Sequence, residues 1–331
     1  MKMQFNQRSD GLLQKKFMTA ALSILAVCAL ARASFGAEVS CLSKYDGTSS
    51  VAPEYLAKLW PSGFRPSPGM CRVAFLRGTI EKGDYEKFRA ILRLNYRTLL
   101  YVKLSSSGGD VDESIKIGKL MRKYLLTAEA PAGHNPDTDA LGLPPTLHND
   151  LPPTFSNNPF SYLVQDLCRG PDCVCASACA LIWFGATTRE GTVGVHRPHT
   201  NDPEFKNASP GDAANLYRQM IATVVHYLDE MEVPRAVNDI FTETHSSEIK
   251  WIYTSIDDRS LDHPPSYAEW LSASCGRLTD AEDNAYWKLV GKQTRDTNEA
   301  MLYDRLSKKT AEISTCEVVL RYSRVDQLDP P

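Results

Sequence analysis

One serine of this chain stands in a setting suited to nucleophilic chemistry. Ser177 is the centre of the stretch C-A-S-A-C (residues 175–179), which leads into an apolar run ending at Phe184. Small neighbours leave room for a substrate carbonyl, and the N–H after the nucleophile, here on Ala178, can face the oxyanion formed in acyl transfer. The alternative role for such a serine is to cap a helix or to lie inside one.

A histidine suited to act as the base follows 19 residues later. His196 ends a predicted short strand, residues 192–196, in the sequence G-V-H-R-P. Histidine is the usual base for a serine nucleophile, and the end of a strand holds it rigidly. His199 is the alternative base, and a buried structural histidine is the alternative role.

A pair of glycines adds a third motif. The stretch S-S-S-G-G-D-V (residues 105–111) runs from a strand end into a helix, and Gly108 and Gly109 leave backbone N–H groups accessible there. Such groups near a helix N-terminus stabilise developing negative charge. A plain turn explains this stretch when it is taken alone. The order of glycine pair, serine and histidine is what indicates an active site.

These motifs fall at the joints of an alternating pattern of strands and helices. Short apolar runs alternate with segments of helical periodicity, which is typical of parallel βαβ units and predicts an α/β fold. The predicted elements are a strand at 73–76, a helix at 84–94, a strand at 98–104, a helix at 111–125, an apolar segment at 176–185, a strand at 192–196 and a helix at 212–231. Thr279 and Glu282 form a capping box before a charged amphipathic stretch to about residue 313.

Residues 131–158 interrupt this pattern. They hold six of the chain's 20 prolines and no Lys or Arg, so we expect a surface insertion. The chain then divides into a signal peptide (1–36), an N-terminal segment (37–70), an α/β domain (71–260) that carries the insertion, and a helical C-terminal extension (261–331).

The first 36 residues have the order of an export signal. Arg8, Lys15 and Lys16 precede an apolar run over residues 17–31, and small residues follow at 33, 34, 36 and 37. The run is shorter than the roughly 20 residues that a membrane span needs. We expect cleavage after residue 36, with 33 and 37 as alternatives, and a periplasmic or secreted protein with no membrane association after cleavage. An uncleaved anchor is the alternative.

The cysteines predict disulfides. The chain has nine, of which Cys28 lies in the signal peptide. An even remainder in an exported protein indicates disulfides, because the compartment beyond the membrane is oxidising. We expect Cys41 to pair with Cys71 and Cys275 with Cys316. The other four are Cys168, Cys173, Cys175 and Cys179. Zinc is the alternative for these four, but their spacing is not two C-x-x-C pairs, so no metal is predicted.

Composition excludes several classes of protein. The hydrophobic content of 43%, the charged content of 23% and the mean hydropathy of -0.31 are those of a globular chain, not of a polytopic membrane protein or a mostly disordered one. The pI of about 6.2 and the formal net charge of -3 provide no basic surface for nucleic acid. We therefore predict no nucleic-acid partner.

The three motifs together resemble the Clp-protease proteolytic subunit of the ClpP/crotonase-like superfamily, especially its exported bacterial members. The resemblance spans about residues 73–257, with G-x-I at 78–80, S-x-G-G at 106–109, A-S-A at 176–178 and H-x-P at 196–198. It implies a ClpP/crotonase-like spiral of ββα units. It also implies that Ser177 is the nucleophile and His196 the base. The same resemblance implies that Gly109, with Gly108 as the alternative, forms the oxyanion hole together with the N–H of Ala178.

The sequence departs from the family pattern at three places. Ser107 replaces a proline in the glycine turn, the interval from serine to histidine is short, and Glu248 stands where the family has a catalytic aspartate. A glutamate can orient a histidine as an aspartate does. Asp239, Glu243 and Asp257 are alternatives for this third residue.

We expect an exported serine peptidase-like hydrolase that acts on short or unfolded peptides and needs no metal, nucleotide or other cofactor. ATP-driven partners are cytoplasmic, so export implies ATP-independent action. In the family the helix at 212–231 mediates subunit contacts, which makes a homo-oligomer a further expectation. The alternative function is a non-catalytic scaffold that binds a peptide or protein partner. A Cβ added at Gly109 is expected to intrude on the space of the substrate.

Overall fold

The computed structural model of the chain describes residues 36–45, 53–131, 173–198, 203–253, 261–290, 292 and 294–331. Ala37–Pro331 form one compact unit, distinct from Met1–Gly36. The predicted signal peptide up to residue 35 and residues 132–158 of the predicted insertion lie outside the described residues. So do Cys168, His199 and Asp257.

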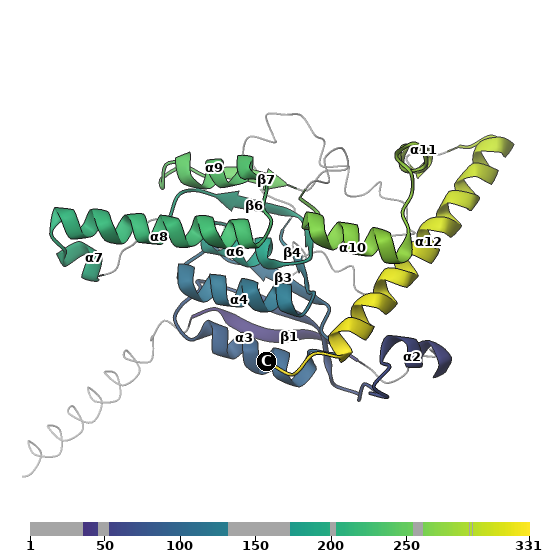
Figure 1. The fold of residues 1–331 in the computed structure, drawn as a ribbon, viewed down its shortest axis with the longest axis horizontal. Helices are drawn as coiled ribbons and strands as arrows, with labels where there is room; N and C mark the ends of the chain where they lie inside the picture. The colour runs from purple at the N-terminus through teal and green to yellow at the C-terminus, as the bar shows by residue number, and fades with distance from the viewer. Residues whose placement is uncertain are drawn as a thin grey trace, which may run out of the picture. The chain divides into compact units, whose positions relative to one another are not determined.

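A five-stranded sheet forms the centre of this unit (Figure 1). Its strands lie in chain order: β1 (Glu38–Lys44), β2 (Cys71–Arg77), β3 (Tyr101–Ser105), β4 (Thr127–Glu129) and β5 (Thr188–Glu190). β1 runs antiparallel to β2, and all other neighbours run parallel. The fold is α/β with a mostly parallel sheet, as the alternating pattern of the sequence predicts. The predicted N-terminal segment supplies strand β1.

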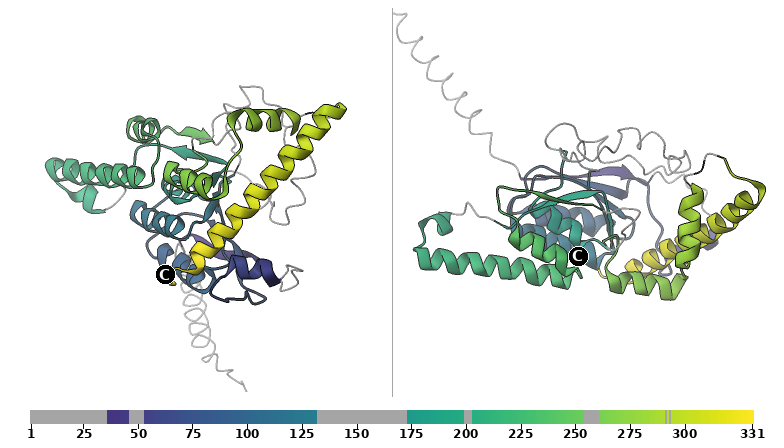
Figure 2. Two further views of the ribbon diagram at one scale, coloured as in Figure 1. Left: turned by 45° about the vertical axis from the view of Figure 1, so that its right-hand side comes forward. Right: turned by 90° about the horizontal axis from the view of Figure 1, so that it is seen from above.

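Three helices pack side by side along the sheet (Figures 1 and 2): α3 (Asp84–Asn95), α4 (Val111–Lys123) and α6 (Ala178–Gly185). Every residue of α6 is buried, which is why its sequence is apolar all round instead of amphipathic. α6 approaches α4 very closely, since a Cβ on Gly185 would fall 2.4 Å from the Cα of Gly118. This contact fixes α6, and with it the serine at its N-terminus.

The predicted histidine follows a separate pair of strands. β6 (Thr192–Val195) and β7 (Lys250–Tyr253) form an antiparallel two-stranded sheet. Between them lie α7 (Pro203–Asn207), α8 (Pro210–Glu230) and α9 (Arg235–Glu243). α8 confirms the helix predicted at 212–231. Its N-cap is Ser209, whose hydroxyl accepts a hydrogen bond from the N–H of Asp212.

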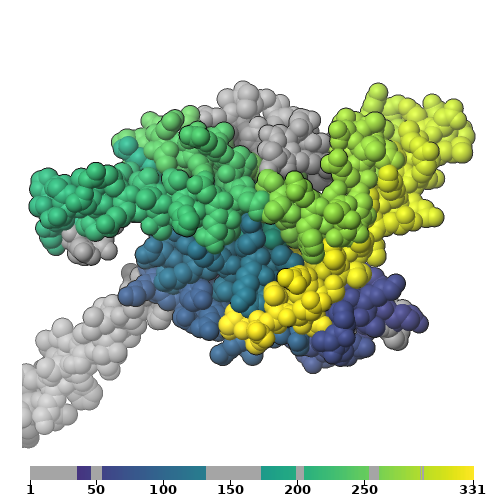
Figure 3. Space-filling view, viewed as in Figure 1, coloured from purple at the N-terminus to yellow at the C-terminus, as the bar shows by residue number. Residues whose placement is uncertain are grey.

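The described part of the C-terminal region contains the helices α10 (Pro265–Cys275), α11 (Asp280–Val290) and α12 (Thr297–Asp326). The predicted capping box is present: Glu282 accepts from the N–H of Thr279, and the Thr279 hydroxyl accepts from the N–H of Glu282. The amphipathic stretch does not continue unbroken to residue 313, because a second capping box, Asp296 with Glu299, starts α12. Figure 3 shows α12 lying along the surface.

One end of α12 is fastened to the rest of the unit. The carboxylate of Asp326 is buried and accepts hydrogen bonds from the N–H and the hydroxyl of Ser62, both at 2.7 Å. It also pairs with Arg97 at 3.0 Å. Ser62 follows the short helix α2 (Pro53–Leu59), so these contacts join both ends of the unit.

Three disulfides join described cysteines, and two of them are the predicted pairs Cys41–Cys71 and Cys275–Cys316. The third joins Cys175 to Cys179. Cys173 is disulfide-bonded as well. Within the described ranges, no helix is both long and apolar enough to cross a bilayer. The disulfides are compatible with an oxidising compartment.

Candidate active site

The backbone brings the glycine turn and the serine motif together. Ser106 donates from its N–H to the carbonyl of Val174 at 2.6 Å, and its carbonyl accepts from the N–H of Ala176 at 3.0 Å. These two bonds form a short parallel bridge between Ser106 and Cys175. A strand end near residue 105 and the entry to α6 therefore lie next to each other, although they are far apart in the sequence.

The histidine strand joins the same site from the other side. The N–H of Ser177 donates to the carbonyl of Gly194 at 2.8 Å, and the N–H of Gly194 donates to the carbonyl of Cys175 at 2.8 Å. His196 follows Gly194 by two residues, just beyond the end of β6. All three sequence motifs are thus connected by main-chain hydrogen bonds, and alternation along the strand places His196 and Gly194 on the same face.

Ser177 occupies an unusual backbone conformation at the N-terminus of α6. Its φ is 56° and its ψ is -123°, and its side chain makes no capping hydrogen bond. A residue other than glycine in this region costs on the order of 1–3 kcal/mol and is found where function requires it. The serine therefore stands at the N-cap position, outside the interior of α6, and does not form the hydrogen bond of a cap.

The nucleophile candidate is enclosed by a covalent ring. Cys175 and Cys179 form a disulfide, and both residues are fully buried. Only three residues separate the two half-cystines, and Ser177 is the middle one. Because these sulfurs are bonded to each other, neither is a thiolate ligand for the zinc site considered from the sequence. No described group of three or more His, Cys, Asp or Glu side chains could hold a metal ion.

Gly108 and Gly109 both lie in the positive-φ region, at 111° and 140°. A Cβ on Gly108 would fall 2.6 Å from the Cβ of Ser177 and 3.1 Å from the N of Ala178, so this glycine faces Ser177. A Cβ on Gly109 would fall 2.1 Å from the carbonyl oxygen of Ile80. This corrects the expectation that a side chain on Gly109 would enter the space of the substrate, because it would collide with the neighbouring backbone instead.

The hydrogen bonds of the turn distinguish its two glycine N–H groups. Gly108 donates to the hydroxyl of Ser106 at 3.1 Å, and its carbonyl accepts from the N–H of Ile80 at 2.9 Å. In a trans peptide the next N–H points opposite to that carbonyl, so the N–H of Gly109 points away from Ile80. The N–H of Ala178 is at the first position of α6, where it has no intrahelical partner. These two groups are the donors available for an oxyanion.

His196 is 7% exposed, and its ring is held by the main chain. Its Nδ1 lies 2.9 Å from the carbonyl oxygen of Arg197. A carbonyl only accepts, so this contact requires the proton on Nδ1 in the neutral ring and makes Nε2 the basic nitrogen. That is the tautomer which a serine nucleophile needs from its base.

Glu248, the predicted third catalytic residue, lies in a more exposed environment than His196. The side chains of Glu248, Glu243 and Asp239 are all exposed, whereas the imidazole is buried. Glu248 lies two residues before β7. It is the side chain of Ile249 that reaches toward Gly194, with Cγ2 2.6 Å from the position of an added Cβ. The assignment of Glu248 as the orienting acid stays a prediction.

A buried ion pair on the sheet escaped the sequence analysis. Lys103 of β3 and Glu129 of β4 are register partners with buried side chains, and their charged groups pair directly. The alternation of polar and apolar residues along β3 was the available signal, since Val102 and Leu104 point the other way. Glu190 continues the row on β5 with an exposed side chain.

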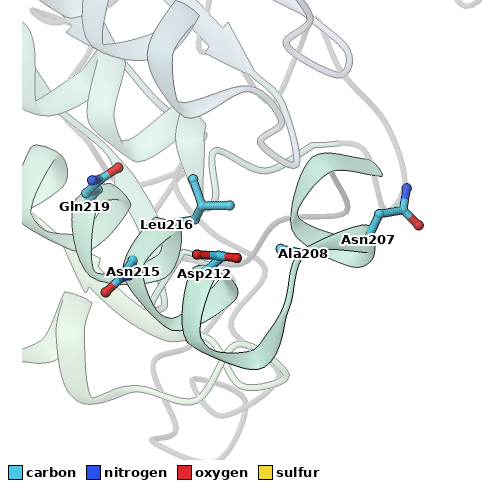
Figure 4. Close-up of a pocket in the computed structure, with 6 residues that line it drawn as sticks. All are labelled: Asn207, Ala208, Asp212, Asn215, Leu216 and Gln219. Atoms are coloured by element: carbon cyan, nitrogen blue, oxygen red, sulfur yellow. The ribbon is translucent and has the colours of Figure 1, made fainter.

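A shallow hollow lies between α7 and the N-terminal half of α8, and Figure 4 shows its lining. It is lined by Asn207, Ala208, Asp212, Asn215, Leu216 and Gln219. None of these residues belongs to the three motifs, and amide side chains dominate the lining. We therefore place the candidate active site at the serine and not in this hollow.

The chain matches no protein-family model and no curated protein. Among solved structures it is similar to a point mutant of ClpP1 from Listeria monocytogenes, with 14% identity and a TM-score of 0.33 over 55% of this chain and 82% of that one. A similarity at this level adds nothing to the case for a particular chemistry. That case depends on the residues themselves.

Proposed function

We propose that the protein is an exported serine hydrolase of the peptidase type, with Ser177 as nucleophile and His196 as base. The observation that carries the proposal is the pair of hydrogen bonds by which Gly194 holds Cys175 and Ser177. These bonds link the strand that carries the histidine to a serine in a strained, non-capping conformation. We also infer that the strands and helices follow the ββα spiral that the sequence motifs imply.

The proposed reaction is acyl transfer through a covalent intermediate. The Ser177 oxygen attacks the carbonyl carbon of the scissile peptide bond while its proton passes to Nε2 of His196. The carbonyl oxygen becomes an oxyanion, stabilised by the N–H groups of Gly109 and Ala178. The amine leaves with the proton from the imidazolium. Water then attacks the acyl ester and gives a proton to the imidazole; as the ester C–O bond breaks, the imidazolium returns that proton to the Ser177 oxygen and the acid product leaves.

In this scheme the main chain orients the imidazole. The Arg197 carbonyl holds Nδ1 as the acid of a triad would, but it carries no full charge and stabilises the imidazolium less. We therefore propose a serine–histidine pair as the minimal catalytic unit and give Glu248 an auxiliary role. Short or unfolded peptides are the proposed substrates. No ATP-driven partner is invoked, because the proposed compartment is the periplasm or the exterior of the cell.

The second candidate function is a scaffold that binds a peptide or protein partner without turnover. The exposed position of every described candidate acid favours it, because water screens an exposed carboxylate, which then stabilises an imidazolium less. The two functions share the same site residues and differ in whether Ser177 is activated. A homo-oligomer assembled through α8 is compatible with either function.

A fluorophosphonate probe separates the two functions, since it labels only an activated serine. We expect the wild type to be labelled, and Ser177→Ala and His196→Ala to lose labelling almost equally, because members of one catalytic unit fail together. His199→Ala is the matched control and should label normally. If the folded wild type is not labelled, the scaffold replaces the hydrolase. If His199→Ala is silent while His196→Ala labels, the base has been misassigned.

A further inference from the structure

The N–H of Ala37 is held by a buried carboxylate. Ala37 is 1% exposed, and its N–H donates to Oδ2 of Asp84 at 2.7 Å. Asp84 is fully buried at the start of α3. The carbonyl of Ala37 accepts from Nζ of Lys87 at 3.3 Å. Both main-chain groups of one small residue are therefore bound by charged side chains of the same helix.

The Asp84 site offers more charge than a neutral main-chain N–H requires. Oδ2 of Asp84 also accepts from the N–H of Glu81 at 2.7 Å, and Oδ1 pairs with Lys87 at 2.7 Å. One oxygen of this carboxylate therefore has two backbone donors, and the other has the ammonium group of Lys87. An ionised carboxylate 2.7 Å from a backbone nitrogen suits an ammonium group there better than it suits a neutral amide.

We propose that the mature chain begins at Ala37 and that its new α-ammonium group forms a buried ion pair with Asp84. Hydrolysis of the Gly36–Ala37 peptide bond consumes one water and leaves a carboxylate on Gly36 and an amine on Ala37. The amine takes up a proton at neutral pH, because its ordinary pKa is about 8. The ion pair therefore exists only after processing.

The structure discriminates among the cleavage positions that the sequence left open. Cleavage after residue 37 would remove Ala37, and Asp84 would lose a buried partner. Cleavage after residue 33 would put the charge three residues away from the carboxylate. Only cleavage after Gly36 places the ammonium nitrogen at the position that Asp84 already binds.

The ion pair lies close to the proposed oxyanion turn. Asp84 holds the N–H of Glu81, and the preceding residue, Ile80, donates to the carbonyl of Gly108 at 2.9 Å and accepts from Asp110 at 2.8 Å. Processing would thereby stiffen the segment against which the glycine turn is built. This last step rests on the proposed hydrolase function, whereas the ion pair itself does not.

The pH dependence of the ion pair follows from the groups around it. Asp84 and Lys87 face Ala37 from α3, and Glu38 of β1 pairs at 3.4 Å with Arg77 of β2 on a half-exposed surface. A carboxylate partner favours the charged amine and raises its pKa in the folded state. The stabilisation is therefore complete below about pH 8 and is lost as the pH rises through the folded-state value.

The test is a double-mutant cycle between the N-terminus and Asp84. Two chains are compared, one beginning at Ala37 and one at Gly36, each with Asp84 or with Asp84→Asn. A hydrogen bond to a charged group is worth about 1.4 kcal/mol more than a neutral one, a factor of about ten. We expect Asp84→Asn to reduce the folding equilibrium constant about tenfold more in the chain that begins at Ala37, and this excess to disappear well above pH 8.

Glu86→Gln is the matched control, because Glu86 lies on the same helix with an exposed side chain and should cost both chains equally. Equal losses from Asp84→Asn in the two chains would overturn the ion pair. So would a mass spectrum of the exported protein that begins at Ser34 or Glu38.

Probe labelling separates this inference from the hydrolase proposal. We expect the chain that begins at Ala37 to label faster than the chain that begins at Gly36. Equal labelling of the two chains would refute the effect on the turn. No labelling of either chain, with the stability coupling intact, would refute the hydrolase and leave the ion pair standing.

Discussion

Substitution of Gly108 by alanine tests whether the glycine turn and Ser177 form one site. The new Cβ would lie 2.6 Å from the Cβ of Ser177, 3.0 Å from the carbonyl oxygen of Ala176 and 3.1 Å from the N of Ala178. None of these three atoms can turn away by a change of rotamer, because two belong to the backbone and the position of a Cβ is fixed by the backbone. The φ of 111° is also unfavourable for any residue with a side chain.

The magnitude follows from these distances. Ordinary contact begins at 3.4 Å, so the turn and the serine must separate by roughly 0.8 Å if the clash is to be relieved. A displacement of about 1 Å can cost on the order of 100-fold in rate, because the oxyanion donors move with the turn. If the turn does not move, the backbone strain of about 1–3 kcal/mol and the overpacking of about 1–3 kcal/mol appear as lost stability.

The assay is the rate of fluorophosphonate labelling, measured beside unfolding in urea. Gly211→Ala is the matched control, because its Cβ would meet no atom closer than Ser209 Oγ at 3.9 Å, and it lies near the start of the exposed part of α8. We expect Gly108→Ala to label roughly 100-fold more slowly or to unfold at lower urea, and Gly211→Ala to do neither. If Gly108→Ala labels and unfolds like the wild type, the glycine turn does not face the serine.

Three further predictions concern Glu248 and the disulfides. Glu248→Gln should change labelling little, because the carboxylate is exposed; a loss approaching the about 10⁴-fold caused by removing a triad acid would contradict this. Replacing Cys175 and Cys179 by alanine should cost about 2 kcal/mol in urea unfolding and should also slow labelling, because the ring around the serine opens. Replacing Cys275 and Cys316 opens a longer loop, so it should cost about 4 kcal/mol and leave labelling of the folded protein unchanged. Equal effects of the two double replacements on labelling would show that the inner disulfide only stabilises the fold.

The sequence predicts well whatever depends on local periodicity. The helix predicted at 84–94 is α3 (Asp84–Asn95), and the strand predicted at 73–76 is the centre of β2 (Cys71–Arg77). The apolar side chains of the first segment recur with the period of a helix, which indicates a helix. Those of the second form a short run, which is typical of a buried strand. The places where the motifs fall, at strand ends and helix starts, follow from the same patterns.

Long-range pairing cannot be predicted in this way. β4 (Thr127–Glu129) and β5 (Thr188–Glu190) have three residues each, too few to show a period. β1 (Glu38–Lys44) pairs with one strand only, so its sequence is polar and does not show the apolar run of a buried strand. The contact between Ala37 and Asp84 joins residues 47 positions apart through a main-chain N–H. The type of a residue does not indicate which partner its N–H will bind.

The Cys175–Cys179 disulfide restrains the conformation that Ser177 adopts. Ser177 is held at a φ of 56°, where it would relax if its neighbours allowed it. The bond from its N–H to Gly194 opposes this relaxation, but Gly194 belongs to a two-stranded sheet, which is a weak support when it stands alone. The Cys175–Cys179 ring restrains the same five residues covalently and does not depend on that sheet. Such a restraint persists only in an oxidising compartment, so the conformation of Ser177 fits the compartment that the proposed export would provide.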